Sequence, residues 1–288
     1  MERLQGRTAV VTGSTRGLGL AIAKAFVREG ARVVVSSRRA EAVDDAVATL
    51  GPDLVEGVVA DVARKDAHEA LLAAALERFG RLDVWVNNAG LSGIYGPTPA
   101  IPDEDFLRVL DTNVRGVYFG STVASRHFLA HGGGKLINIL GRGDRGPVAN
   151  QNAYASSKTW VRSFTLALAR ETKGHDIGVF AFNPGLMLTD LVGEVRAVRG
   201  YEARLRPFTT ILRLWAEAPA VPAEVVVELA SAATDGKTGL ARNMLTPRRM
   251  LSGVLRDLGR RLRREPAPDI ELNVRSADPV VPVDRTPR

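Results

Sequence analysis

The chain has 288 residues, of which 45% are hydrophobic, enough for the core of one large α/β domain with helices on both faces of a sheet. Lysine and arginine outnumber aspartate and glutamate by 39 to 32, and the formal charge of +7 suits phosphorylated or acidic ligands without by itself indicating nucleic acid. Cysteine is absent and the four histidines share no ligand spacing, which excludes a disulfide framework and a thiolate metal site. We therefore expect a small-molecule ligand, no nucleic acid and no metal.

Short apolar runs alternate with helix-like segments along most of the chain, as in a parallel sheet with crossover helices. Most of these runs are apolar rather than alternating, which is typical of strands covered on both faces. This pattern predicts an α/β fold, a doubly wound parallel sheet of about seven strands. The strands are expected at Thr8 to Val11, Arg32 to Ser36, Leu54 to Val59, Leu82 to Val86, Lys135 to Leu140, Ile177 to Phe182 and Leu240 to Leu245. The helices are expected at Gly17 to Glu29, Ala40 to Leu50, Lys65 to Phe79, Glu104 to His131, Ala153 to Lys173 and Ala223 to Ala233.

A glycine-rich run, Thr12-Gly13-Ser14-Thr15-Arg16-Gly17-Leu18-Gly19, directly follows the first strand and opens a helix. In that context Gly13 makes the tight turn, Gly17 lets backbone approach phosphates, and Gly19 lets the helix pack closely on the sheet. A pyrophosphate would lie at the helix N-terminus. We therefore expect a dinucleotide to contact Gly13, Ser14, Thr15, Arg16, Gly17, Leu18 and Gly19.

The end of the second strand indicates which dinucleotide is bound. An acidic residue there would accept hydrogen bonds from the adenosine ribose and select NAD, but the strand runs into Ser36-Ser37-Arg38-Arg39. Ser37 and Arg38 lie where a 2′-phosphate would be, and Arg16 would reach it from the other side. The sequence therefore predicts NADP(H); the alternative is that these arginines are only solvated surface residues.

Tyr154 and Lys158 lie one helical turn apart in Asn152-Ala153-Tyr154-Ala155-Ser156-Ser157-Lys158, so both side chains project from the same helix face. A positive charge near the phenol favours its ionised form, and we expect Lys158 to lower the pKa of Tyr154. The two residues thus form a candidate acid/base pair beside the dinucleotide.

The order of these motifs resembles the short-chain dehydrogenase/reductase family over residues 4 to 245. The glycine turn is followed by Asn87-Asn88-Ala89-Gly90, Asn113, Tyr154 with Lys158, and Asn183-Pro184-Gly185 with Thr189. The resemblance implies a Rossmann fold and an NADP(H)-dependent oxidoreductase that interconverts a carbonyl and a secondary alcohol. Tyr154 would exchange the proton, Lys158 would also bond the nicotinamide ribose, and Asn113 would hold a water that relays protons. Asn113 has a simpler alternative, a helix-kink residue bonded to backbone.

The resemblance also implies the remaining cofactor contacts. Asp61 and Val62 would bracket the adenine, although an aspartate after a strand is also a common helix cap. Asn88, Ala89 and Gly90 would form the turn where the cofactor crosses the sheet, and Pro184, Gly185 and Thr189 would fix the nicotinamide carboxamide.

One family residue is missing, because Gly141 stands where a serine usually polarises the substrate oxygen. Three alternatives follow. A neighbouring hydrogen-bond donor, Arg142, Asn150, Gln151 or Asn152, replaces the serine; or groups of the substrate itself supply the hydrogen bond; or the chain is no longer an efficient dehydrogenase. We expect Gly141, Arg142 and Asn152 to contact substrate, and glycine there to enlarge the pocket for a bulky substrate. The alternative functions are an NADP(H)-binding regulator and a non-redox dehydratase or isomerase.

The domain boundaries follow from the same resemblance. Residues 1–245 would form the dinucleotide-binding and catalytic domain, with 191–221 as a substrate lid or an ordinary helical connection. Residues 246–288 form a C-terminal extension. Family members commonly pair through the two long helices at 104–131 and 153–173, so a homodimer or homotetramer is expected.

Within the extension, leucines and a valine repeat at helical spacing opposite a group of arginines. The apolar positions are Leu251, Val254, Leu255, Leu258 and Leu262, and the arginines are Arg256, Arg260, Arg261, Arg263 and Arg264. We expect the stripe to pack on the chain's own fold or a partner subunit; the alternative is weak binding at an anionic membrane surface. Residues 265–288 should be extended or disordered. No apolar run approaches a bilayer span and the first strand leaves no room for a signal peptide, so we expect a cytoplasmic protein.

Overall fold

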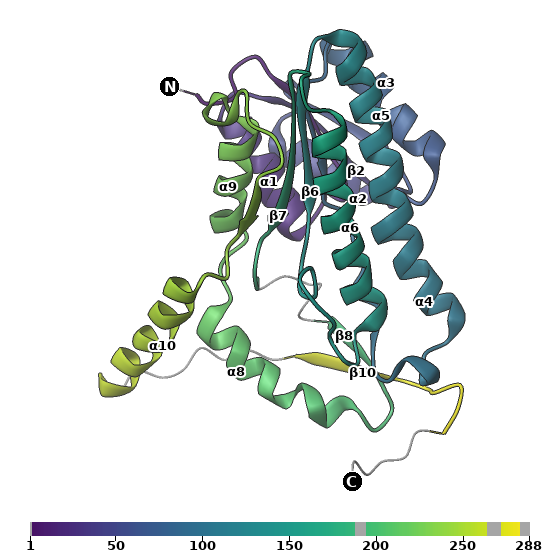
Figure 1. Cartoon of the computed structure of the whole chain (residues 1–288), viewed down its shortest axis with the longest axis vertical. Helices are drawn as coiled ribbons and strands as arrows, with labels where there is room; N and C mark the ends of the chain where they lie inside the picture. Colours follow the sequence, from purple (N-terminus) through teal and green to yellow (C-terminus); the bar gives the residue numbers. More distant parts are fainter. Residues whose placement is uncertain (1, 188–193, 264–271, 283–288) are drawn as a thin grey trace.

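The computed structural model describes residues 2–187, 194–263 and 272–282. Seven strands form one parallel sheet in the order β3-β2-β1-β4-β6-β7-β9, with helices on both faces (Figure 1). This order reverses between β1 and β4, and a reversal of this kind creates a crevice at the carboxyl ends of the strands. The expected doubly wound Rossmann fold is confirmed. The strands are β1 (Thr8–Val11), β2 (Arg32–Ser37), β3 (Val55–Val59), β4 (Val84–Asn87), β6 (Gly134–Ile139), β7 (Ile177–Asn183) and β9 (Ala241–Asn243).

Two apolar cores cover the two faces of the sheet. One lies between the sheet and helices α1 (Gly17–Arg28), α2 (Ala40–Leu50) and α9 (Ala220–Ala230). The other lies beneath α3 (Lys65–Phe79), α5 (Gly116–His131) and α6 (Asn152–Glu171). Strands β1, β4 and β7 are buried along their whole length, as expected for apolar runs covered on both faces, whereas β3 and β9 at the two edges of the sheet are partly exposed.

The helix expected at 104–131 is interrupted in the structure. It consists of α4 (Asp103–Leu110), a π-helical turn η2 (Asp111–Arg115) and α5. The interruption coincides with Asn113, whose side chain bonds a neighbouring loop, as described below. A π-turn of this kind is a frequent feature of functional sites.

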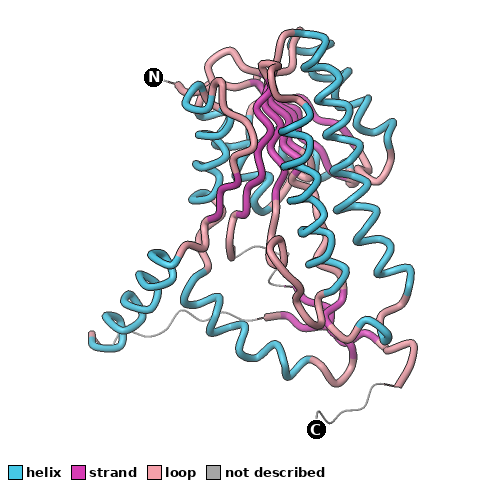
Figure 2. The backbone as a smooth tube through the Cα atoms, viewed as in Figure 1, coloured by secondary structure: helices cyan, strands magenta, loops and turns pink. Residues whose placement is uncertain are grey.

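A second, three-stranded parallel sheet that the sequence did not predict lies beyond the carboxyl ends of the main sheet (Figure 2). Its order is β10-β8-β5, from β5 (Ile94–Tyr95), β8 (Glu194–Val198) and β10 (Asn273–Ala277). Within residues 265–288, expected to be extended or disordered, β10 is an extended strand that pairs with β8 over its whole length, a pairing that the sequence did not predict. The tail therefore returns to the edge where the crevice opens.

Helix α8 (Arg206–Trp215) lies beneath the same edge, and α10 (Pro247–Leu262) packs against α8 (Figure 1). The segment expected as a lid, residues 191–221, thus contains β8 and α8 where it is described. Short 3-10 turns, η1 (Thr98–Ala100), η3 (Glu202–Leu205) and η4 (Ala232–Thr234), complete the assignment. None of the helices in the described ranges combines the length and apolar character that crossing a bilayer requires.

Candidate active site

The glycine turn between β1 and α1 is shaped by close backbone packing. Gly13 and Gly17 have φ values of 62° and 54°, in the left-handed region that favours glycine. A Cβ at Gly13 would lie 2.9 Å from Ala89 Cα, and one at Gly19 would overlap the Gly13 carbonyl oxygen. Larger residues at Gly13 or Gly19 would push apart the loops that meet here, so the predicted roles of these two glycines match the geometry.

Residues 88–90, after β4, hold the glycine turn in place. The Thr12 hydroxyl accepts hydrogen bonds from the backbone N–H groups of Asn88 and Ala89, at 3.0 and 3.1 Å. The Asn88 side-chain amide donates to the carbonyl oxygens of Thr12 and Gly13, at 2.9 and 3.0 Å. Asn88 thus braces the turn. Gly90 lies deeper, since a Cβ there would be 3.3 Å from Asn113 Oδ1 and 3.7 Å from Lys158 Nζ.

Two further residues of the turn have structural partners. The buried Ser14 hydroxyl donates to the Val11 carbonyl at 2.6 Å and accepts from the Ser36 N–H at 2.9 Å, which ties β1 to β2. Leu18 belongs to the core beneath α1. Arg16 is exposed at the N-terminus of α1, and Thr15 is half-buried beside it.

At the end of β2, Arg38 is exposed and its guanidinium makes no hydrogen bond or ion pair with any residue that the structure describes. Ser37 instead bonds the Arg39 backbone, at 3.2 and 3.3 Å. A cationic donor therefore stands at the strand end, where an acidic residue would bind a ribose diol.

Asp61 and Val62 follow β3, on the same edge of the sheet. Asp61 Oδ1 accepts a hydrogen bond from the Ala63 N–H at 3.0 Å, so the alternative of a local turn cap is realised at one carboxylate oxygen. Val62 is 9% exposed, and a Cβ at Gly116 would lie 3.1 Å from its Cγ2. The aspartate thus has a structural role, and contact of the pair with an adenine remains a prediction.

Tyr154 and Lys158 lie side by side near the start of α6, as their spacing predicts. Lys158 Nζ is 5.6 Å from the centroid of the Tyr154 ring and donates to the Ile139 carbonyl, at the end of β6, at 3.0 Å. The lysine is buried and the tyrosine is half-buried. Both residues therefore lie at the carboxyl edge of the sheet, where the strand order reverses.

The pKa values correct one expectation. Burial, with a smaller contribution from the negative charge of Asp144, raises the pKa of Tyr154 to about 12. Burial also lowers the pKa of Lys158 to about 8. The expected lowering of the Tyr154 pKa is therefore not found, because burial is the largest cause of its shift and the charge of Asp144 acts in the same direction.

Asn113 is fully buried in the π-helical turn and exchanges two hydrogen bonds with the Leu91 backbone. Its Oδ1 accepts from the Leu91 N–H at 2.8 Å, and its Nδ2 donates to the Leu91 carbonyl at 2.9 Å. Nδ2 also donates to the Ser157 hydroxyl on α6, at 3.0 Å. Both amide hydrogens are occupied, so the backbone-bonded alternative accounts for this side chain. A water relay through it remains a prediction.

Gly141 contacts the phenol directly. A Cβ at this position would overlap the Tyr154 hydroxyl and lie 3.0 Å from Cζ. The expectation that glycine here enlarges the pocket is corrected, because the Tyr154 side chain fills the space. Glycine at 141 thus permits this position of the phenol.

The donors proposed from the sequence would act on the substrate oxygen, and this role remains a prediction. Arg142 is exposed, and the Asn152 side chain donates to the Thr98 hydroxyl at 3.1 Å. In the described part of the chain the Tyr154 hydroxyl makes no hydrogen bond. Its proton is therefore available to a substrate.

Asp144 is a residue of the site that no sequence motif predicts. This carboxylate is only 6% exposed, lies in the loop after β6, and raises the pKa of Tyr154. The Asn183 side-chain amide donates to Asp144 Oδ1 and to the Gly141 carbonyl, both at 3.1 Å, and Arg162 lies 3.6 Å from Oδ2. Because Asp144 lies among glycines and arginines in a loop, its sequence context predicts a solvent-exposed charge, and no motif indicates a role in the site.

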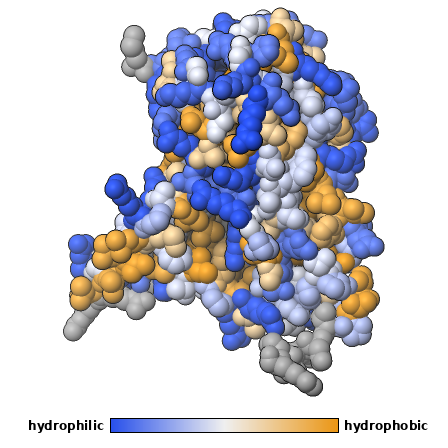
Figure 3. All heavy atoms as spheres, viewed as in Figure 1, coloured by the Kyte–Doolittle hydropathy of each residue, from blue (hydrophilic) through white to orange (hydrophobic). Residues whose placement is uncertain are grey.

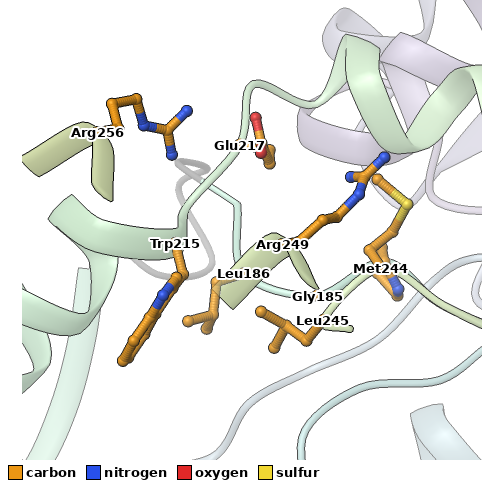
Figure 4. A pocket seen from close by; sticks show the side chains of 9 residues that line it. Gly185, Leu186, Trp215, Glu217, Met244, Leu245, Arg249 and Arg256 are labelled. Atoms are coloured by element: carbon orange, nitrogen blue, oxygen red, sulfur yellow. The ribbon is translucent and has the colours of Figure 1, made fainter. Parts of the chain in front are cut away.

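The segment after β7 forms the side of the site opposite α6. Pro184 is buried, and Gly185 has a φ of 75° and donates from its N–H to Asn183 Oδ1 at 3.0 Å. Thr189 lies outside the described residues. Beside this segment is a small hollow of about 10 Å³, lined by both apolar and charged side chains (Figure 4). It is lined by Pro184, Gly185, Leu186, Trp215, Glu217, Met244, Leu245, Arg249 and Arg256.

A larger groove opens at the opposite edge of the sheet, where the strands begin. Lys135 in this groove is buried, with its Nζ 2.7 Å from Asp235 Oδ1 and 2.9 Å from the Thr234 hydroxyl. Burial lowers the pKa of this lysine. The pair joins β6 to the turn after α9, a structural role, and the nucleotide motifs all lie at the other edge.

Comparison with known proteins agrees with the geometry. The model of the short chain dehydrogenase family matches residues 7–200. The chain is 36% identical over 186 residues to a sorbitol dehydrogenase of Cereibacter sphaeroides, covering 64% of this chain and 72% of that protein. It is 29% identical over 274 residues to a probable chlorophyll(ide) b reductase of Arabidopsis thaliana, covering 86% of this chain but only 52%, about half, of that protein. A solved 3-ketoacyl-(acyl-carrier-protein) reductase from Brucella melitensis, complexed with NADH, superposes with a TM-score of 0.75 at 30% identity, covering 84% of this chain and 97% of that one.

Proposed function

Because the chain belongs to the short-chain dehydrogenase/reductase family, we propose that it is an NADP(H)-dependent oxidoreductase that interconverts a carbonyl and a secondary alcohol on a large organic substrate. The observation that carries the proposal is the pairing of Tyr154 with Lys158 at the carboxyl edge of the sheet, with the phenol hydroxyl unbonded among the described residues. Such a hydroxyl is positioned to give a proton to a substrate oxygen.

The residues around the crevice fit a nicotinamide dinucleotide. At Gly13 and Gly19 a Cβ would collide with neighbouring backbone, so the turn offers bare N–H groups at the start of α1. Arg38 supports NADP(H) over NAD(H), because its guanidinium makes no bond within the described ranges and would form charge-assisted hydrogen bonds to a 2′-phosphate. When bound, the cofactor supplies or accepts the hydride.

The protonation of Tyr154 suits it to the role of proton donor when a carbonyl is reduced. With its pKa raised to about 12, the phenol is protonated at neutral pH and serves as a proton donor. Asp144 reinforces this state, since its negative charge opposes formation of a second anion nearby. Lys158, held by the Ile139 carbonyl, stands beside the ring and stabilises the phenolate that forms once the proton has left.

The substrate class is inferred from the relatives and not from the hollow beside Pro184 and Gly185, because that hollow is too small for a substrate and is lined by Glu217, Arg249 and Arg256 as well as by apolar side chains. The relative that aligns with 86% of the chain bears the name chlorophyll(ide) b reductase, whereas the sorbitol dehydrogenase aligns with 64%. The longer alignment includes part of the region after residue 200, so we propose a large carbonyl compound rather than a sugar alcohol.

A homodimer or homotetramer is proposed with the same function. Tyr118 and Leu129 on α5 and Trp160 on α6 are 45%, 48% and 36% exposed, and they offer apolar surface on the two helices through which pairing is expected. A single species of monomer mass in light scattering at micromolar concentration would contradict this assembly.

The test follows hydride and proton transfer separately. The protein is mixed with NADPH deuterated at the reactive carbon and a panel of ketones and aldehydes of graded size, and deuterium in the alcohol product is measured by mass spectrometry. We expect label transfer with NADPH, preferably to the larger substrates, and none with Tyr154→Phe, which should still bind NADPH. Binding of NADPH without transfer to any substrate would instead favour a cofactor-binding regulator.

A further inference from the structure

Helix α10 contacts the rest of the chain through a polar side. A Cβ at Gly253 would overlap the Leu214 carbonyl and lie 2.7 Å from Trp215 Cδ1, so α10 and α8 touch closely at this glycine. One turn later Asp257 is 8% exposed, and its Oδ1 lies 2.5 Å from Arg260 and 3.6 Å from Arg213 of α8. The contact is thus made by a glycine and an ion-pair cluster.

The leucines of α10 occupy the opposite side. Leu251, Leu255, Leu258 and Leu262 are 60%, 57%, 50% and 84% exposed. At about 100° per residue they fall within a narrow stripe on the side of the helix away from Gly253 and Asp257. Figure 3 shows the apolar surface that results at the α10 end of the molecule. The prediction that this stripe packs on the chain's own fold is therefore wrong: the helix packs, but the leucines face outward.

This orientation is the reverse of the usual arrangement. An amphipathic helix of a globular protein turns its apolar face to the core and its charges to water. Here the described structure covers Gly253 and Asp257 and leaves the apolar stripe open, together with Arg248, Arg249, Arg256 and Arg263. A stripe of large exposed apolar side chains indicates a surface that binds another protein or a membrane.

The charge of the helix indicates which binding partner fits the stripe. Residues 247–263 contain six arginines and one acid, Asp257, which is already paired with arginines. Arg248 is exposed on the flank of the stripe. Two copies joined leucine to leucine would bring two such helices together with no acid free to offset their charge, whereas an anionic lipid surface offers both an apolar layer and negative headgroups.

We propose that the stripe Leu251, Leu255, Leu258 and Leu262 seats the chain on an anionic lipid surface. The leucines would enter the boundary between headgroups and acyl chains, and the arginines would lie at the headgroups. Because α10 packs on α8 and Arg249 and Arg256 line the hollow beside Gly185, the bound surface would lie next to that hollow. The binding itself does not depend on the proposed redox activity.

The test is co-sedimentation of the full chain with two sets of vesicles, pure phosphatidylcholine and phosphatidylcholine with about one third phosphatidylglycerol, at low salt, where such attraction is least screened. We expect binding to the anionic vesicles, at least tenfold weaker binding to the neutral ones, and release at high salt. The variant Leu251→Ser/Leu255→Ser/Leu258→Ser should lose binding while keeping its melting temperature, because these side chains are exposed. Leu107→Ser on α4, where the leucine is 55% exposed, is the matched control and should bind like the parent.

Three outcomes would overturn the proposal. The first is equal vesicle binding by the parent and the triple variant, and the second is no binding by the parent. The third is a triple variant that becomes smaller in light scattering while neither protein sediments with vesicles, since the stripe would then be an interface between copies.

Discussion

Gly141→Ala tests whether this glycine exists to accommodate the Tyr154 phenol. The added Cβ would overlap the phenol hydroxyl and lie 3.0 Å from Cζ and 3.4 Å from Cε1, where ordinary contacts begin at 3.4 Å. The overlap between the Cβ and the hydroxyl is the most severe of these contacts, so the hydroxyl must move by roughly 1 Å. Protein interiors are close-packed, so neighbouring side chains cannot absorb a shift of that size. A displacement of that size at a reacting group costs about 100-fold in kcat/KM, or about 2.7 kcal/mol.

The assay measures steady-state reduction of the best carbonyl substrate together with the dissociation constant for NADPH. Gly146→Ala is the matched control: it lies in the same loop, its φ is not positive, and an added Cβ meets no atom within 4 Å. We expect Gly141→Ala to lose about two orders of magnitude in kcat/KM with NADPH affinity unchanged, and Gly146→Ala to remain within about twofold of the parent, because surface changes away from contacts have small effects.

Gly141→Ser separates displacement of the phenol from the loss of a donor. If the position of Tyr154 dominates, serine should be as harmful as alanine, since both carry the same Cβ. Serine variants more active than the parent would refute the reasoning, and so would an alanine variant with full activity. A parallel loss of NADPH affinity would show that the substitution disturbs the cofactor site instead.

Three further predictions concern charge and protonation. Arg38→Ala should weaken NADPH binding by about 10- to 150-fold, equivalent to about 1.5 to 3 kcal/mol, and leave NADH nearly unchanged, with Arg39→Ala as the control in fluorescence titrations. The reduction rate should stay level up to about pH 8 and fall above it, because Lys158, whose pKa is lowered to about 8, loses its proton there. Tyr154, whose pKa is raised to about 12, keeps its proton over this range. A rate that rises from pH 8 to 10 would contradict this assignment. Asp144→Asn removes the negative charge that contributes to the raised Tyr154 pKa, so that pKa should fall in a spectrophotometric titration of the phenol, while the limb near pH 8 that Lys158 sets stays in place; an unchanged Tyr154 pKa would exclude Asp144 from setting the phenol's protonation.

The main sheet could be predicted from the sequence because its information is local. Buried parallel strands are continuous apolar runs, and β1, α2 and α3 begin and end at the predicted residues. The small sheet could not be predicted in this way. β8 and β10 are five residues each, carry polar side chains, and pair across about 80 positions of sequence, so no local pattern indicates their partner.

The candidate site divides in the same way. The turn around Gly13 and the pair Tyr154 and Lys158 follow from spacing along one strand–turn–helix unit and one helix. The protonation of the pair does not, because it depends on burial and on Asp144, which approaches from another loop. The side of α10 that faces the rest of the chain could not be predicted either, because helical spacing shows which residues share a face but not what that face contacts.

Asn183 connects the separate parts of this site. Its buried side-chain amide donates to the Gly141 carbonyl and to Asp144, and its Oδ1 accepts from the Gly185 N–H. One carboxamide therefore fixes the glycine that meets the phenol, the carboxylate that raises the phenol's pKa, and the segment expected to hold the nicotinamide. A buried amide bonded in this way resists rotation, since moving it would leave several polar groups unpaired. The loop after β6 and the segment after β7 should therefore respond to a bound ligand as one unit, so that the position of the phenol and its protonation change together.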